Sequence, residues 1–267
     1  MSTEIHPTAV IEDGAEIGDG CNIGPYCYIG PHVTLGNDNV LHSHAVIDGY
    51  TTLGDRNEVF SFACLGKISQ DLKYNKAWVS YSRIGSGNVF REYVTVNASS
   101  TEGEATMIGD QGLFLSYSHI AHDCILGSHI ILSSDAKMAG HVQIDDHAIV
   151  NAKSGIIQFA HIGKFAFVGG FNKVMKDILP YCIAEGIPSE IRAVNKIGLQ
   201  RNGYTADRIK PIQEAFRTII RSGLSLTEAV ETLNEKYPNV AEVQEMIRFA
   251  TESRIGLARP HKHRKFE

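Results

Sequence analysis

Residues 118–124 concentrate side chains that could move a proton. The segment is Ser-His-Ile-Ala-His-Asp-Cys, so Asp123 directly follows His122. A neutral imidazole, with a pKa of about 6.5, is suited to general-base work near neutral pH. A neighbouring carboxylate can orient the ring and stabilise the imidazolium that forms. The pair predicts a site at which His122 accepts a proton from a substrate and Asp123 assists it.

The elements that must position this pair follow a six-residue period. Ile, Leu or Val stands at every sixth residue from Ile5 to Leu65, and apolar residues keep the same period from Ile108 to Val174. The fifth position of each hexad is usually small. Such a period is typical of a parallel β-helix, in which three short strands close one triangular coil. Gly and Asn at the corners are expected to supply the positive φ that the turns need.

A coil of three hexads makes residues eighteen apart into neighbours on adjacent coils, at about 4.8 Å. His122 should therefore lie beside Gly140, and Gly140 beside Gln158. By the same spacing, Asp123 should lie beside His141. A glycine next to the histidine exposes a backbone N–H that could stabilise a developing oxyanion. The alternative is that these histidines are ordinary corner residues without a chemical role.

Two segments depart from the period, at residues 66–82 and 97–106. A solenoid can accommodate insertions only as surface loops. Long loops on a rigid scaffold often carry binding groups. We therefore expect these two loops to contribute to a binding site.

The period ends after Val174, and the rest of the chain has helical patterns. We expect a β-helix domain at residues 1–186 and a small α-helical domain at residues 187–267. An apolar stripe predicts a helix at residues 206–222. Ser225 and Glu228 form a capping-box pattern for a second helix, and Asn239 is expected to open the last one.

Composition limits the class of protein. The chain has 267 residues and 43% apolar content, without a signal-peptide pattern or an apolar run of transmembrane length. We expect a cytoplasmic protein with no integral membrane segment and no nucleic-acid partner. The five cysteines do not suggest disulfides, because Cys21, Cys27 and Cys124 occupy the small inward position of a hexad.

Charge differs between the two parts of the chain. Residues 1–186 carry 11 Lys/Arg and 20 Asp/Glu, which gives a net charge of −9. Residues 187–267 carry 14 Lys/Arg and 10 Asp/Glu, which gives a net charge of +4. The basic C-terminal part consists either of ordinary solvated helix faces or of a docking surface for an acidic partner.

Several segments together resemble the UDP-N-acetylglucosamine O-acyltransferases that begin lipid A biosynthesis. The resemblance covers nearly the whole chain, and its most specific parts are Gln-Asp-Leu-Lys-Tyr at 70–74 and His-Ile-Ala-His-Asp-Cys at 119–124. Other matching segments are His-Pro-Thr-Ala at 6–9, Ile-Gly-Pro-Tyr-Cys at 23–27, Ala-Gly-His at 139–141, Gln-Phe at 158–159, Val-Gly-Gly at 168–170 and Gly-Leu-Gln-Arg at 198–201. The resemblance implies a left-handed parallel β-helix followed by helices, and a homotrimer.

The resemblance also implies an activity: transfer of a 3-hydroxyacyl chain from acyl carrier protein to the 3-hydroxyl of UDP-N-acetylglucosamine. His122 would be the general base, Asp123 would orient it, and the Gly140 N–H would stabilise the oxyanion. The donor would be the phosphopantetheine thioester of acyl carrier protein, with no further cofactor. The residues expected to contact the nucleotide sugar or the donor are Asp71, Lys73, His119, His141, Gln158, Asn195 and Arg201.

Gly170 falls where the family sets the length of the acyl chain, and Phe167 is a possible limit nearby. Acyl carrier proteins are strongly acidic, which gives the basic C-terminal part a partner. The candidate contacts are Arg192, Lys196, Arg201, Arg208, Lys210, Arg217 and Arg221.

The chain departs from the family pattern at three places. The family's IHRGT-like stretch is here Val-Asn-Ala-Ser-Ser-Thr at 96–101. Ile157 replaces a histidine before Gln158, and Asn202 replaces an arginine. These differences keep open an acceptor such as a 3-amino sugar nucleotide.

Two other functions use the same kind of scaffold. Trimeric β-helices of the γ-carbonic anhydrase type bind zinc through histidines, but the spacing of His119 and His122 forms no specific ligand signature. The long helical part also argues against that class, so we expect no metal. A non-enzymatic scaffold is the remaining alternative, and it would have no strict need for His122.

Overall fold

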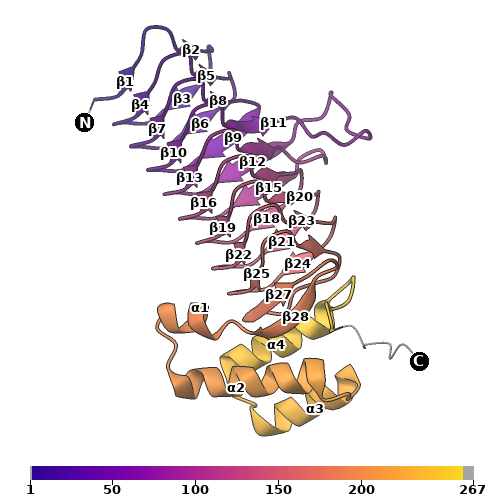
Figure 1. Cartoon of the computed structure of the whole chain (residues 1–267). Coiled ribbons are helices and arrows are strands. Elements are labelled where there is room, and N and C mark those ends of the chain that lie inside the picture. Colours follow the sequence, from indigo (N-terminus) through magenta and orange to yellow (C-terminus); the bar gives the residue numbers. More distant parts are fainter. Residues whose placement is uncertain (1, 261–267) are drawn as a thin grey trace.

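The computed structural model describes residues 2–260, and it forms a prism-shaped β-helix capped at its C-terminal end by helices (Figure 1). The β-helix is left-handed, as the resemblance implies. Strand pairs lie eighteen residues apart in regular coils, for example Ile5 with Ile23 and Ile29 with Ile47. The six-residue period thus predicted the architecture correctly.

Three sheets form the sides of the prism. The first contains β1 (Glu4–Ile5), β4 (Asn22–Ile23), β7 (Val40–Leu41), β10 (Glu58–Val59), β13 (Val89–Phe90), β16 (Leu113–Phe114), β19 (Ile131–Leu132), β22 (Ile149–Val150), β25 (Phe167–Val168), β27 (Cys182–Glu185) and β28 (Glu190–Val194). The second contains β2 (Val10–Ile11), β5 (Tyr28–Ile29), β8 (Val46–Ile47), β11 (Cys64–Lys67), β14 (Thr95–Asn97), β17 (His119–Ile120), β20 (Lys137–Met138), β23 (Gly155–Ile156) and β26 (Lys173–Val174). The third contains β3 (Glu16–Ile17), β6 (Thr34–Leu35), β9 (Tyr50–Leu53), β12 (Tyr81–Ile84), β15 (Ala105–Ile108), β18 (Ile125–Leu126), β21 (Gln143–Ile144) and β24 (His161–Ile162).

The core fills the inside of the prism. The aliphatic first residue of each hexad points inward, and Ile29, Ile47 and Leu65 are fully buried. Cys27 and Cys124 are also buried and free, as expected for compact apolar groups. The rows of inward side chains make each coil depend on its neighbours, which gives the outer corners a rigid support.

The corner turns correct one expectation. Positive φ occurs mainly at non-glycine residues in the fourth position of hexads, such as Tyr26 (58°), His44 (63°) and Asp123 (60°). Within residues 2–260, no Asn has a positive φ. Stacked rings help to hold these corners, since the ring centroids of Tyr26 and His44 are 5.0 Å apart. Ladder hydrogen bonds and ring stacking can offset the cost of this conformation.

Both predicted loops are present, although each is slightly shorter than expected. The first projects between β11 and β12, at residues 68–80 (Figure 1). The second joins β14 to β15, at residues 98–104. Because they are insertions, strand partners across them are further apart in sequence: Val59 pairs with Phe90, and Val96 with Ile120.

The helices follow an antiparallel β27–β28 pair, so the proposed division at residue 186 falls in the turn of that hairpin. The helical elements are α1 (Lys196–Arg201), α2 (Ala206–Phe216), a π-helical turn at Arg217–Arg221, α3 (Leu226–Lys236) and α4 (Ala241–Glu252). The capping box of Ser225 and Glu228 is confirmed. The expectation for Asn239 is wrong: Val240 is the N-cap of α4, and it makes no side-chain capping bond.

The helical part packs against the last coils. The Tyr181 hydroxyl donates a hydrogen bond to Glu245 of α4, and the ring centroids of His161 and Phe249 are 4.4 Å apart. Among the described residues, no helix has both the length and the apolar character needed to cross a membrane.

Candidate functional site

His122 lies at the corner that follows β17 and is 5% exposed. Its Nδ1 is 2.7 Å from Asp123 Oδ2, and its Nε2 is 4.0 Å from Asp71 Oδ2. The first contact leaves Nε2 as the nitrogen available to a substrate, provided that Nδ1 carries the proton. The loop at residues 68–80 thus brings Asp71 close to a histidine that is about fifty positions later in the chain.

Asp123 is also almost covered, with a side-chain exposure of 9%. Burial by itself would raise the pKa of this carboxyl. Hydrogen bonds from Ser100, Ser99 and His122 outweigh burial, and they hold the Asp123 pKa below its ordinary value. Asp123 is therefore a carboxylate at neutral pH and can favour a positive charge on His122.

Gly140 lies directly beside the His122 ring, as the spacing of eighteen predicted. The His141 N–H donates to the His122 carbonyl at 3.0 Å, which fixes the register of the two corners. A Cβ added at Gly140 would be 2.3 Å from His122 Cε1 and 2.6 Å from Nε2. No side chain can be placed at this position unless the imidazole moves.

The Gly140 N–H is free to meet a substrate. Within residues 2–260 it donates to no acceptor. The third position of a hexad lies outside the strand ladder, which is why Pro25 and Pro31 are tolerated at equivalent corners. An unpaired N–H next to a general base is suitably placed to stabilise an oxyanion.

A cavity of 340 Å³ lies in front of His122. Its lining residues are Gln70, Asp71, Asn97, His119, Ala121, His122, Met138, Ala139, Gly140 and Gln158. Five of them, Gln70, Asn97, Ala121, Met138 and Ala139, were not predicted as site residues, although Gln70 belongs to a motif that the sequence displays. The first insertion loop thus reaches the cavity through Gln70 and Asp71, and Asn97, which directly precedes the second loop, reaches it as well. This is expected for loops with a binding role.

His119 contributes a second imidazole to this cavity. Its Nδ1 is 2.7 Å from Thr95 Oγ1. Burial, with a smaller effect from Lys137, lowers the His119 pKa below its ordinary value. His119 is therefore neutral near pH 7 and can exchange hydrogen bonds with a polar ligand.

A larger cavity of 790 Å³ begins on the other side of Asp123. His141 lines it together with Phe159, and the two rings are stacked with centroids 4.9 Å apart. His141 Nε2 is 3.6 Å from Asp123 Oδ2. Asp123 and His141 are neighbours, as predicted, and Phe159 continues the same ladder. All three residues line this cavity.

Five predicted residues line neither cavity within this chain. Lys73 is exposed beside Asp71, and its N–H donates to Asp71 Oδ1 at 2.9 Å. Asn195 caps α1: its Oδ1 accepts from the Gly198 N–H at 3.1 Å, and its Nδ2 donates to the Phe165 carbonyl at 2.9 Å. The other three are Arg201 at the end of α1, Phe167 in β25 and Gly170 at a corner after β25.

The site contains one group of side chains with metal-ligating chemistry. Ligand atoms of His122, Asp123 and His141 all lie within 4.8 Å of one another. The Asp123 oxygens, however, already accept hydrogen bonds from Ser99, Ser100 and His122. A metal would have to displace these donors, so the arrangement fits acid–base chemistry better than ligation.

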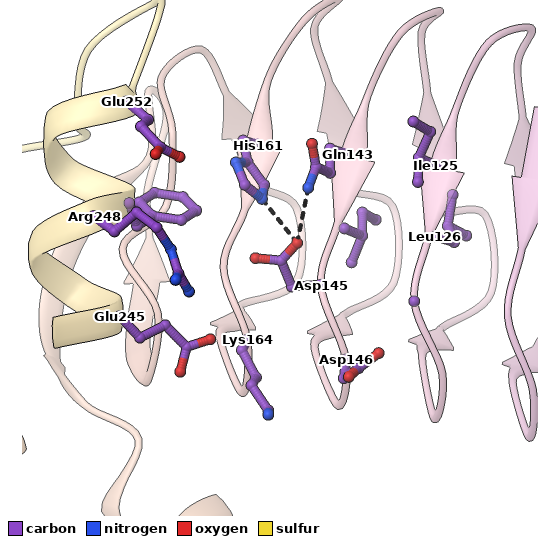
Figure 2. A pocket seen from close by; sticks show the side chains of 13 residues that line it. Ile125, Leu126, Gln143, Asp145, Asp146, His161, Lys164, Glu245, Arg248 and Glu252 are labelled. Atoms are coloured by element: carbon purple, nitrogen blue, oxygen red, sulfur yellow. Dashed lines mark hydrogen bonds and ion pairs between the residues drawn. The ribbon is translucent and has the colours of Figure 1, made fainter. Parts of the chain in front are cut away.

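A third cavity, of 390 Å³, adjoins the second and lies between coils of the third sheet and α4 (Figure 2). It holds a second histidine–aspartate pair, in which His161 Nε2 is 2.8 Å from Asp145 Oδ1. Gln143 donates to the same oxygen at 3.1 Å. Because the His161 ring packs on Phe249, this pair contributes to the attachment of α4. Gly127 also lines the cavity, but its N–H is already bonded to the Ile144 carbonyl.

Comparisons with known proteins agree with this geometry. The family model described as UDP N-acetylglucosamine O-acyltransferase, domain 2, matches residues 177–258, and the bacterial transferase hexapeptide model matches residues 2–31 and 14–49. The acyl-[acyl-carrier-protein]–UDP-N-acetylglucosamine O-acyltransferase of Gloeothece citriformis is 44% identical over 95% of this chain and 91% of its own length. The enzyme of the same description from a Synechocystis strain is 43% identical over 91% of this chain and 89% of its own length.

Solved structures give the same result. The UDP-N-acetylglucosamine acyltransferase of Campylobacter jejuni superposes with a TM-score of 0.90 at 36% identity, over 97% of this chain and 100% of that one. The UDP-N-acetylglucosamine acyltransferase of Francisella novicida superposes with a TM-score of 0.91 at 33% identity, over 97% of this chain and 95% of that one. The similarity therefore includes both the β-helix and the helices.

Proposed function

Because the chain belongs to the family of acyl-[acyl-carrier-protein]–UDP-N-acetylglucosamine O-acyltransferases, we propose that it transfers a 3-hydroxyacyl chain from acyl carrier protein to the 3-hydroxyl of UDP-N-acetylglucosamine. This reaction is the first step of lipid A biosynthesis. The observation that carries the proposal is the contact of His122 with Asp123 on one side and Gly140 on the other, at the wall of a cavity.

The proposed reaction begins with removal of the sugar hydroxyl proton by His122 Nε2. The oxygen attacks the thioester carbonyl, and the tetrahedral intermediate places its negative charge near the Gly140 N–H. Asp123 stabilises the imidazolium through Nδ1. The intermediate then expels the phosphopantetheine thiolate, which takes the proton back from His122. The chemistry requires no bound cofactor or metal.

Substrate contacts follow from the same cavities. Asp71, His119 and Gln158 line the cavity in front of His122 and are placed to hold the sugar. His141 lines the adjoining cavity and can contact the nucleotide or the donor. Lys73 extends from the same loop as Asp71, where its charge can reach a phosphate or the donor.

A homotrimer would complete the site. The outward residues Val89, Leu113, Ile131 and Ile149 form an apolar row on the first sheet and remain partly exposed in the single chain. Parallel prisms related by threefold symmetry can cover such rows. Asn195 and Arg201 line neither cavity of their own chain, so we propose that they serve the site of an adjacent subunit. We also place the enzyme in the cytoplasm, where acyl carrier protein is found.

The function is tested with purified protein, 3-hydroxyacyl-acyl carrier proteins of several chain lengths and UDP-N-acetylglucosamine. We expect an acylated nucleotide sugar, detected by mass spectrometry. The acceptor used for comparison is the analogue of UDP-N-acetylglucosamine that has an amine in place of the 3-hydroxyl. Faster acylation of the amine would show that the changes at Ile157, Asn202 and residues 96–101 have altered the acceptor, and would reject the O-acyltransferase assignment.

Gly170 is proposed to leave room for a long acyl chain, with Phe167 as a limit nearby. A Cβ added at Gly170 would meet only the Ala152 carbonyl oxygen, at 3.4 Å, so the backbone can accept a side chain. Gly170→Met is expected to lower kcat/KM for the longest accepted donor, relative to a shorter one, by about 10–200-fold. An unchanged ratio in a folded variant would show that Gly170 does not limit the groove.

The basic helical part is proposed to bind acyl carrier protein. Arg192 and Arg208 are engaged with Glu190 and Glu242, which leaves Lys196, Lys210 and Arg217 as the better candidates. The remaining candidates are Arg201 and Arg221.

Charge reversal tests that surface. Lys210→Glu with Arg217→Glu is expected to raise the KM for acyl carrier protein by about tenfold at low salt, with less effect at high salt. Arg56→Glu, an exposed charge reversal on the β-helix, is the matched control. Equal effects of the control and the double variant would argue against a specific surface.

A further inference from the structure

The loop at residues 98–104 holds the carboxylate of Asp123 in place. We propose that Ser99 and Ser100 are positioning residues for the His122–Asp123 pair, an inference that rests on the proposed function. The Ser99 hydroxyl donates to Asp123 Oδ1. The Ser100 hydroxyl donates to Oδ2 at 2.6 Å, and the Ser100 N–H lies 3.2 Å from the same oxygen. One loop therefore contacts both oxygens of the carboxylate.

The Ser99 hydroxyl is directed toward Asp123 by its surroundings. Its oxygen accepts a hydrogen bond from the Thr101 N–H at 3.0 Å. Its proton has two acceptors, and Asp123 Oδ1 is closer than the Thr101 carbonyl oxygen, which is 3.3 Å away. Ser99 is 0% exposed, and water cannot easily replace it. Loss of this hydroxyl would leave a nearly covered carboxylate oxygen without one of its donors.

The strand that follows this loop, β15, holds the main chain of Asp123. The Asp123 N–H donates to Thr106 Oγ1 at 2.8 Å, and the residue has a φ of 60°. Asp123 is thus fixed at its backbone and at both carboxylate oxygens. The insertion supplies the contacts to the carboxylate, and Thr106 of β15 supplies the contact to the main chain.

A fixed carboxylate matters because Oδ2 faces two imidazoles. It is 2.7 Å from His122 Nδ1 and 3.6 Å from His141 Nε2. Rotation of the carboxylate would weaken its bond to His122, and the ring could then adopt the tautomer or orientation that withholds Nε2. The two serines prevent this rotation, and so set the basicity of the pair without touching the substrate.

The test compares Ser99→Ala, Ser100→Ala and the double variant with the parent enzyme, using the full chain. We expect kcat to fall about tenfold for each lost hydroxyl, with little change in the KM for the nucleotide sugar. A carboxylate that is free to rotate stabilises the His122 imidazolium less, so the acid limb of the kcat–pH profile moves to lower pH.

Two variants separate positioning from a merely structural effect. Ser99→Thr keeps the hydroxyl and is expected to restore the kcat and the acid limb. Ser116→Ala removes another serine–carboxylate bond, 2.9 Å to Glu92, away from the site, and is expected to leave both unchanged. An acid limb that stays in place in the double variant, or a Ser99→Thr variant as impaired as Ser99→Ala, would overturn the proposal.

A measurement without substrate keeps this result independent of the proposed function. The downfield proton resonance of His122 Nδ1–H reports its bond to Asp123, and it is expected to shift upfield in the serine variants. A shift in an enzyme that acylates no acceptor would support the positioning role and reject the function. An unshifted resonance, together with unchanged kinetics in an active enzyme, would reject the positioning role alone.

Discussion

His122→Ala is expected to lower the kcat of acyl transfer by about 10²–10⁴-fold, the range that general acid–base catalysis usually supplies. In the proposed reaction His122 Nε2 accepts the proton of the sugar hydroxyl. Within residues 2–260 no other imidazole combines a bond to a buried carboxylate with a glycine N–H beside it. The KM for UDP-N-acetylglucosamine should change much less, because the proton is transferred only in the transition state.

The control for this prediction is His129→Ala. His129 is an exposed corner histidine stacked on His147, and its loss should leave kcat near the parent value. Thermal unfolding of both variants checks that each is folded. A kcat of His122→Ala within about threefold of the parent, in folded protein, would remove the general-base assignment.

Gly140→Ala is expected to lower kcat by at least about 100-fold, although the substitution adds a single methyl group. The new Cβ would overlap the His122 imidazole, at 2.3 Å from Cε1. The ring must turn away, and this movement disrupts both the bond to Asp123 and the position of Nε2. Ala keeps the main-chain N–H, so the loss comes from the displaced general base, whose contribution to kcat is typically about 10²–10⁴-fold.

A double-variant cycle shows whether this loss acts through the histidine. If the methyl group works mainly by displacing His122, then Gly140→Ala should cost little more in a His122→Ala background. A crystal structure of Gly140→Ala should show the ring rotated away from Asp123. Full activity with an unmoved ring would contradict the geometry proposed for the site.

The central part of the site could be predicted from the sequence because the fold repeats. In a coil of eighteen residues, counting alone places Gly140 beside His122 and His141 beside Asp123, and the main-chain bond from His141 to His122 confirms that register. Such counting works wherever strands stack without interruption. It also predicted the inward apolar positions and both insertions.

The rest depended on contacts that counting does not describe. Asp71 reaches His122 from an insertion whose path is set by its own turns. Ser99 and Ser100 were visible as a departure from the family pattern, but their bonds to Asp123 depend on how the second insertion folds. A repeat period contains no information about either loop.

The helical part was predicted less completely, for a related reason. Helix α1 has six residues, too few for an apolar period to be recognised, and β28 pairs by extending a sheet past the end of the repeats. The N-terminus of α4 has no capping side chain, so the polar signal at Asn239 placed its start one residue too early. Tertiary packing determines these elements more than local sequence does.

The most direct test of the proposed reaction is to locate the acyl group on its product. The parent enzyme and His122→Ala are incubated with a 3-hydroxyacyl-acyl carrier protein and UDP-N-acetylglucosamine, and the nucleotide product is examined by proton NMR. We expect the parent product to show the sugar H3 moved downfield by an ester at O3, and the variant to form it far more slowly. Esterification at another position, no product with folded parent, or equal rates for the two proteins would contradict the proposed reaction.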